Sequence, residues 1–198
     1  MSGTLRLQKL HTKKKKHDHI EFLLSNGLSL IYNDPRRFGF ILDGTIESYK
    51  SKFIDNFGID ALSSSLNSKT LTKILNKKTK IKELLMNQKF IGGIGNIYAS
   101  EILYAARINP YSISCNLSTK SISKLLYSIK RVLNKAIKLG GSSISNYYGV
   151  TSKTGHFQIN FMVYSRENKK CKSCSGKISK EIIAQRSTFF CNSCQIYY

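Results

Sequence analysis

Two cysteine pairs near the C-terminal end, Cys171-Lys172-Ser173-Cys174 and Cys191-Asn192-Ser193-Cys194, decide the fold of the last part of the chain. Two residues between the cysteines of each pair let the backbone bend, so that both sulfur atoms face one point. Residues 175–190, between the pairs, are long enough for a β-hairpin that brings the pairs together. Four thiolates form a closed tetrahedral site, which predicts one structural Zn²⁺. A redox dithiol would need a single Cys-x-x-Cys in a thioredoxin-like setting, which this sequence lacks.

Charge and composition indicate the class of partner. The 198 residues include 32 Lys+Arg and 11 Asp+Glu, which gives a net charge of +21. Such an excess predicts a polyanionic partner, with nucleic acid as the first expectation. An acidic membrane surface is the alternative, but no basic amphipathic helix with tryptophan is found, since tryptophan is absent.

The start of the chain and its hydropathy predict an intracellular protein. Residues 1–6 lack an apolar signal-peptide core, and no uncharged apolar stretch of about 18 residues occurs. We therefore expect a cytoplasmic protein that is a monomer, without a membrane partner. In that compartment the paired cysteines favour metal binding over disulfides. The fifth cysteine, Cys115, is interpreted as a small core or surface thiol.

The first fifty residues have the pattern of β-strands. Spaced leucines occupy residues 5–10, and residues 19–24 and 28–32 form two β-rich runs separated by Ser25-Asn26-Gly27, a typical hairpin signal. Residues 38–42 predict a third strand. Together these strands predict part of a sheet with exposed edges.

Helical periodicity begins at about residue 68. A pair of short helices is expected over 71–89, and a single short helix is expected over 97–106. A long amphipathic helix is expected to begin after Ser118 as its N-cap and to stop at Gly140-Gly141. Residues 142–156 are expected to be a loop, so the fold class is α+β.

Three further segments have the composition of binding sites. In Gly92-Gly93-Ile94-Gly95-Asn96, backbone N–H groups could converge on an anion at a helix start, or the segment could be a tight turn between helices. We expect helices on both sides of it and no strand before it. Asp34–Gly39 contains Arg36, Arg37 and Phe38, which suit a wedge with forked hydrogen-bond donors, although an ordinary charged turn is equally compatible. Residues 149–155 could close over a ligand or could simply link to the cysteine module. The run Lys13–Lys16 is interpreted as a solvated loop.

In combination, these segments resemble one family. The chain is similar, in order and over its whole length, to bacterial formamidopyrimidine-DNA glycosylases, the bifunctional oxidised-purine DNA glycosylase/AP lyases. The resemblance rests on nine segments: Met1-Ser2-Gly3, His17-Asp18-His19, Asp34–Gly39, Gly93–Glu101, Gly140-Gly141, Gly155-His156-Phe157, Val163–Arg166, Ala184–Phe189 and the four cysteines.

The resemblance implies a domain organisation. Residues 1–47 correspond to the back half of the family's N-terminal β-sandwich, and 48–67 to a linker. Residues 68–148 correspond to the helix-two-turn-helix DNA-binding domain. Residues 149–156 correspond to the lesion-capping loop, and 157–198 to the zinc finger, with its four-cysteine β-hairpin.

The resemblance also implies site residues for double-stranded DNA that contains an oxidised purine or an abasic site. Met1, Arg36 and Phe38 match the residues that fill the gap left by the flipped nucleotide, with Arg37 beside them. Lys82, Asn96, Tyr164 and Arg186 match positions that hold phosphates around the lesion. Cys171, Cys174, Cys191 and Cys194 match the zinc ligands.

The family's catalytic proline and glutamate have no counterpart in the sequence, so no catalytic residue is assigned. We interpret the chain as the DNA-clamping and lesion-recognition part of an enzyme of base-excision repair, which acts by Schiff-base β,δ-elimination. On this interpretation the N-terminal catalytic segment is lacking and Met1 is an internal methionine. The alternative is a catalytically inactive zinc-dependent module that recognises lesions or abasic sites, and borohydride trapping on abasic DNA would separate the two. A zinc-ribbon RNA-binding protein is a third, weaker interpretation.

Overall fold

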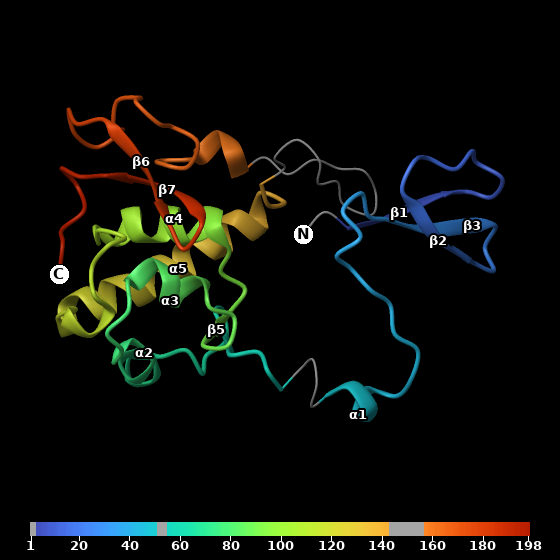
Figure 1. Cartoon of the computed structure of the whole chain (residues 1–198), viewed down its shortest axis with the longest axis horizontal. Helices are drawn as coiled ribbons and strands as arrows, with labels where there is room; N and C mark the ends of the chain where they lie inside the picture. The colour runs from blue at the N-terminus through green and yellow to red at the C-terminus, as the bar shows by residue number, and fades with distance from the viewer. Residues whose placement is uncertain (1–2, 51–54, 143–156) are drawn as a thin grey trace. The chain divides into compact units, whose positions relative to one another are not determined.

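A computed structural model describes residues 3–50, 55–142 and 157–198. The chain divides into two compact units, one formed by residues 1–44 with 138–159, the other by 45–137 with 160–198. Figure 1 shows strands β1 to β3 in the first unit and helices α2 to α5 with hairpin β6–β7 in the second.

The first unit is built on a three-stranded antiparallel sheet. Its order is β1 (Thr4–Lys9), β3 (Leu28–Asn33), β2 (Asp18–Leu23), so β3 is the central strand. The predicted hairpin is confirmed: β2 and β3 pair across a turn in which Gly27 has φ +77°, a conformation that favours glycine. Ile31, on the central strand, is fully buried.

The predicted strand over residues 38–42 is wrong. The described sheet ends with β1 and β2 as its edge strands, and residues 38–42 form no strand beside either of them. The Asp34 side chain also accepts a hydrogen bond from the Gly39 backbone N–H at 2.9 Å, which holds the chain in a turn. A short helix, α1 (Ile46–Tyr49), follows.

The second unit contains the predicted helices. They are α2 (Ser68–Leu75), α3 (Ile81–Met86), α4 (Asn96–Ala106) and α5 (Thr119–Lys138), with a 3₁₀ turn, η2 (Ser114–Asn116), before α5. Ser118 caps α5 as predicted, because its Oγ accepts from the Ser121 N–H at 3.3 Å. The helix ends before Gly140 and Gly141, both at positive φ. None of the helices in the described ranges is long and apolar enough to cross a membrane.

A two-residue strand precedes the glycine segment, which corrects the expectation that none would. β5 (Ile91–Gly92) pairs in parallel with β4 (Ile59–Asp60). Gly58 makes the close approach possible, because a Cβ there would lie 2.3 Å from the Phe90 carbonyl carbon. The pair is too short to give a periodic signal in the sequence.

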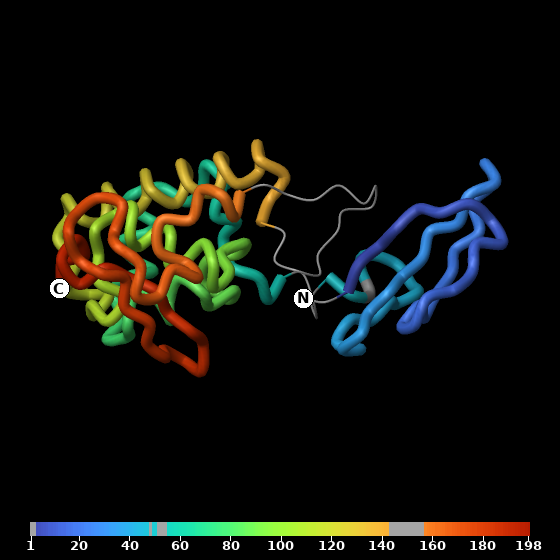
Figure 2. Tube along the Cα trace, turned by 90° about the horizontal axis from the view of Figure 1, so that it is seen from above, coloured from blue at the N-terminus to red at the C-terminus, as the bar shows by residue number. Residues whose placement is uncertain are grey.

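The cysteine module forms the predicted hairpin. After the 3₁₀ turn η3 (Phe157–Asn160), β6 (Ile178–Ile183) and β7 (Arg186–Cys191) pair in antiparallel fashion. The two turn residues, Ala184 and Gln185, both have positive φ, which matches the twist of a tight hairpin. β7 lies against α4 (Figure 1), and Figure 2 shows the hairpin in red.

Candidate metal centre and nucleic-acid interface

The four paired cysteines converge on one point. All four sulfur atoms lie within 4.8 Å of one another. The Cys171–Cys194 sulfurs are 3.7 Å apart and the Cys174–Cys191 sulfurs 3.5 Å apart. A tetrahedron of zinc–sulfur bonds of about 2.3 Å has edges of about 3.8 Å, so this donor set fits one Zn²⁺. With four protein ligands no position is open to substrate, which makes the metal structural.

Helix α4 supports the metal centre from below the hairpin. The Tyr104 hydroxyl lies 3.2 Å from Cys171 Sγ and 2.7 Å from Ser173 Oγ. Tyr104 also shares an apolar core with Val163, Phe189 and Cys191. Burial raises the pKa of Cys171, but hydrogen bonds from Tyr104 and from backbone N–H groups outweigh it and lower that pKa to about 6. The cysteine site is therefore part of the core that joins the finger to α4.

A buried carboxylate on α4 holds the segment that enters the finger. Glu101 is only 4% exposed. Its two oxygens accept hydrogen bonds of 2.9–3.1 Å from the backbone N–H groups of Met162, Val163 and Tyr164. Three successive N–H groups around one carboxylate form an anion nest, which compensates its desolvation.

Three residues predicted to hold phosphates are brought together by hairpin β6–β7. Lys82, on α3, donates from Nζ to Thr188 Oγ1 at 2.6 Å and to Ser187 O at 3.2 Å. Asn96, the first residue of α4, donates from Nδ2 to the same carbonyl at 3.0 Å. Arg186 directly precedes Ser187 at the exposed end of β7. An ammonium has three N–H donors and an amide has two, so these hydrogen bonds leave one N–H on Lys82 and one on Asn96.

Burial gives Lys82 an unusual proton affinity. The side chain is fully buried although lysine is almost never so. Desolvation, with a smaller contribution from the nearby Arg186 charge, lowers the pKa of Lys82 to about 8. A phosphate would oppose this lowering, because a nearby anion favours the ammonium form.

The turn Asp34–Gly39 of the first unit holds the predicted wedge. Asp34 is 1% exposed and accepts hydrogen bonds from the Arg36 and Gly39 N–H groups and from the Tyr32 hydroxyl. Arg37 has φ +54°. The Arg36 guanidinium lies 4.4 Å from the centre of the exposed Phe38 ring, so the two side chains stack before any partner is bound.

The structure also shows where the remaining predicted residues lie. Tyr164 packs edge-on against Phe161 and Phe189, with ring centroids 5.5 and 5.0 Å apart. Cys115 is exposed and lies outside the four-cysteine cluster. Met1 and the predicted capping loop 149–156 lie outside the described residues.

Sequence reasoning assigned no role to Glu101 or Tyr104. Both occur on a helix that is otherwise apolar or small, and a lone acid among buried positions is the signal that could have drawn attention to Glu101. No such signal exists for Tyr104, because its partners are 67 and 69 residues away.

Curated proteins with similar sequences identify the family. The formamidopyrimidine-DNA glycosylase of Rickettsia felis is 43% identical over 98% of this chain, which spans 71% of that protein. The corresponding protein of Wolbachia from Drosophila simulans is 43% identical, again over 98% of this chain and over 72% of its own length. The chain belongs to the formamidopyrimidine-DNA glycosylase family.

Three domain patterns found in the formamidopyrimidine-DNA glycosylase family match successive segments of the chain. The N-terminal domain pattern covers residues 1–41, the H2TH domain pattern 57–148, and the zinc finger found in FPG and IleRS covers 168–196. Two solved structures are similar over 98% of this chain and 72% of theirs, at 37% identity and TM-score 0.88. One is Lactococcus lactis Fpg with DNA that contains an abasic site, and the other a G226P mutant with Fapy-dG DNA. Because the chain belongs to the formamidopyrimidine-DNA glycosylase family, its four-cysteine site is a structural zinc site.

Proposed function

We propose that this chain grips double-stranded DNA at an oxidised purine or an abasic site, as part of base-excision repair by a DNA glycosylase/AP lyase on the bacterial nucleoid. The observation that carries the proposal is the convergence of Lys82, Asn96 and Arg186 around Ser187, at a hairpin fixed by the four cysteines. These three side chains bind backbone phosphates next to the lesion. Phosphate contacts set the position and strength of binding but carry little sequence information.

The wedge provides recognition of the damaged site. When the damaged nucleotide leaves the stack, Phe38 and Arg36 enter the gap, and the guanidinium donates to the unpaired cytosine. Flipping costs a few kcal/mol, and the inserted side chains recover part of it. The Arg36–Phe38 stack favours this role because little side-chain order has to be created on binding.

Three further residues and one loop complete the proposed contacts. Tyr164 adds a phosphate contact at the entrance to the finger, and Arg37 one beside the wedge. Met1 joins the wedge, and residues 149–156 cap the extruded base. About five phosphate contacts predict a log–log salt slope of about −4 to −5.

Removal of the wedge guanidinium tests the recognition step. Arg36→Ala should weaken binding to an abasic duplex with cytosine opposite the gap by about ten-fold, because a forked Arg–base contact contributes about 1–3 kcal/mol. Binding to intact duplex should change by less than three-fold. The matched control is Arg131→Ala on α5, which removes the same charge from an exposed position. If the dependence on the opposite base were the same in Arg36→Ala as in wild type, the role of Arg36 would be wrong.

The lowered pKa of Lys82 predicts a pH dependence of DNA binding. Below pH 8 the side chain carries the positive charge that attracts phosphate, and above pH 8 it progressively loses that charge. At constant salt, the Kd for an abasic duplex should rise roughly ten-fold between pH 7 and pH 9, since one pKa unit corresponds to about 1.4 kcal/mol. Lys82→Met should bind more weakly at pH 7 and lose most of this dependence. A wild-type Kd that stays constant from pH 7 to pH 9 would contradict the assignment.

A further inference from the structure

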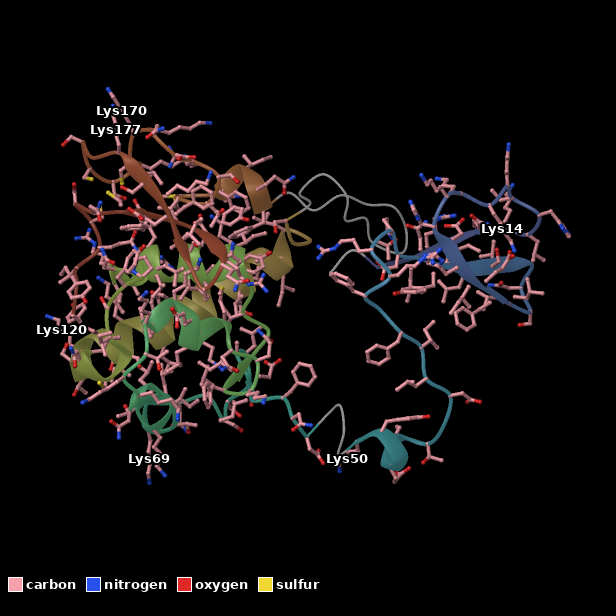
Figure 3. All side chains as sticks on the ribbon, in the orientation of Figure 1. Lys14, Lys50, Lys69, Lys120, Lys170 and Lys177 are labelled. Carbon is pink, nitrogen blue, oxygen red and sulfur yellow. The ribbon has the colours of Figure 1, made fainter. Side chains whose placement is uncertain are left out.

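Four consecutive lysines, Lys13–Lys16, lie on the loop between β1 and β2, and the contacts proposed above do not use them. All four side chains are exposed. Lys14 is labelled in Figure 3 on this loop. Four adjacent ammonium groups repel one another, so the run destabilises the fold unless an anion compensates it.

The loop is held in place by an acid that does not neutralise it. Asp18 accepts hydrogen bonds from the Lys15 backbone N–H at 2.8 Å and from Arg6 at 2.6 Å, and the hydrogen bond from Arg6 keeps its pKa well below the usual range. In the part of this unit that the structure describes, one lysine of the run has an acidic partner within 4.0 Å. Lys14 Nζ lies 3.5 Å from a carboxylate oxygen of Glu21. That pair is solvent-exposed on the lysine side and therefore weak. Most of the run's positive charge remains available to a partner.

The lysine run ends directly beside the wedge turn. The Asn33 side chain donates to the Lys16 carbonyl at 3.1 Å, and the Asp34 N–H donates to the His17 carbonyl at 3.1 Å. His19 Nε2 in turn donates to the Asp34 carbonyl at 2.8 Å. These bonds lie within one compact unit, so the Lys16 end of the run adjoins the turn that carries Arg36 and Arg37.

We infer that Lys13–Lys16 is an additional phosphate-binding site that extends the DNA contact of the wedge along one strand. This inference rests on the proposed function. The three Cα steps from Lys13 to Lys16 span at most about 10 Å, and phosphates of one strand follow at about 3.4 Å along the duplex axis, so up to about three phosphates are within reach. A duplex is favoured over a membrane because residues 11–17 contain no apolar side chain that could anchor in lipid.

The salt dependence of DNA binding tests the site. The variant K13Q/K14Q/K15Q/K16Q is compared with K69Q/K73Q/K120Q/K124Q, which removes the same charge from exposed positions on α2 and α5; Lys69 and Lys120 are labelled in Figure 3. The Kd for one abasic duplex is measured between 50 and 200 mM salt. Loss of about three contacts should make the log–log slope shallower by about 2 to 3, against less than 1 in the control.

The outcomes separate this inference from the proposed function. If wild type prefers abasic over intact duplex but the two quadruple variants have equal slopes, the lysine run is not a contact and only the inference fails. If wild type shows no such preference, the proposed function fails, while a slope reduced only in K13Q/K14Q/K15Q/K16Q still supports the contact with DNA. An unchanged DNA slope with lost binding to phosphatidylglycerol vesicles would assign the run to a membrane surface and overturn the inference.

Discussion

Replacement of Cys191 by serine removes the bound zinc and, with it, most of the affinity for DNA. Cys191 is fully buried, and its sulfur lies 3.5 Å from that of Cys174, so no neighbouring side chain can take its place. Folding of such modules is coupled to metal binding, and binding contributes about 10–16 kcal/mol in zinc-finger peptides. Without zinc, strand β7 loses the anchor that places Arg186 and Ser187 beside Lys82 and Asn96. We expect less than a tenth of the wild-type zinc per chain and at least a hundred-fold weaker binding to an abasic duplex.

Cys115→Ser is the matched control for this experiment. It makes the same chemical change at an exposed cysteine outside the cluster, and both zinc content and affinity should stay at wild-type values. Zinc is measured by its release to a chromogenic chelator, independently of DNA. A full equivalent of zinc in Cys191→Ser would show that the assigned ligand set is wrong.

Replacement of Glu101 by alanine should lower the free energy of unfolding of the second unit by about 3 kcal/mol or more. The change leaves three buried backbone N–H groups, on Met162, Val163 and Tyr164, without their acceptor, and each such group costs about 1–3 kcal/mol. Truncation of the side chain also leaves a cavity on a buried face of α4. In a domain of this size, such a loss lowers the Tm by about 6 to 12 °C.

Glu83→Ala provides the comparison for Glu101→Ala. Glu83 lies on α3, is partly exposed and pairs with Lys80 at the 4.0 Å limit of an ion pair, so its removal should change stability by less than 0.5 kcal/mol. Urea unfolding followed by circular dichroism measures both variants. Equal midpoints for Glu101→Ala and wild type would mean that the nest does not stabilise the fold.

The sequence predicts the elements whose signals are local. The hairpin of β2 and β3 follows from alternating apolar runs around Asn26-Gly27, and α5 from its 3.6-residue period between Ser118 and Gly140. The strand predicted over residues 38–42 does not form, and the local sequence pattern does not reveal why. β propensity indicates that a segment fits a sheet, but not that the Asp34 side chain holds its start in a turn through the Gly39 N–H.

The metal site could be predicted completely, whereas the cluster of Lys82, Asn96 and Arg186 around Ser187 could not be derived from the residues alone. Cysteine spacing determines the ligand set by itself, and the structure adds only the distances between the sulfur atoms. Lys82, in contrast, is one of many lysines in a basic chain. Its distinguishing properties, full burial and contacts with Ser187 and Thr188, depend on residues more than a hundred positions away. The nest around Glu101 was missed because its N–H donors lie 61 to 63 residues further along the chain.

The central claim is that the chain is shaped to hold a duplex from which one nucleotide has left the stack. The most direct measurement is the ratio of two dissociation constants at one salt concentration, for a duplex with a tetrahydrofuran residue opposite cytosine and for the intact duplex of the same sequence. A gap avoids most of the flipping cost of a few kcal/mol, so we expect at least ten-fold tighter binding to the tetrahydrofuran duplex. Equal affinity for the two duplexes would contradict the account.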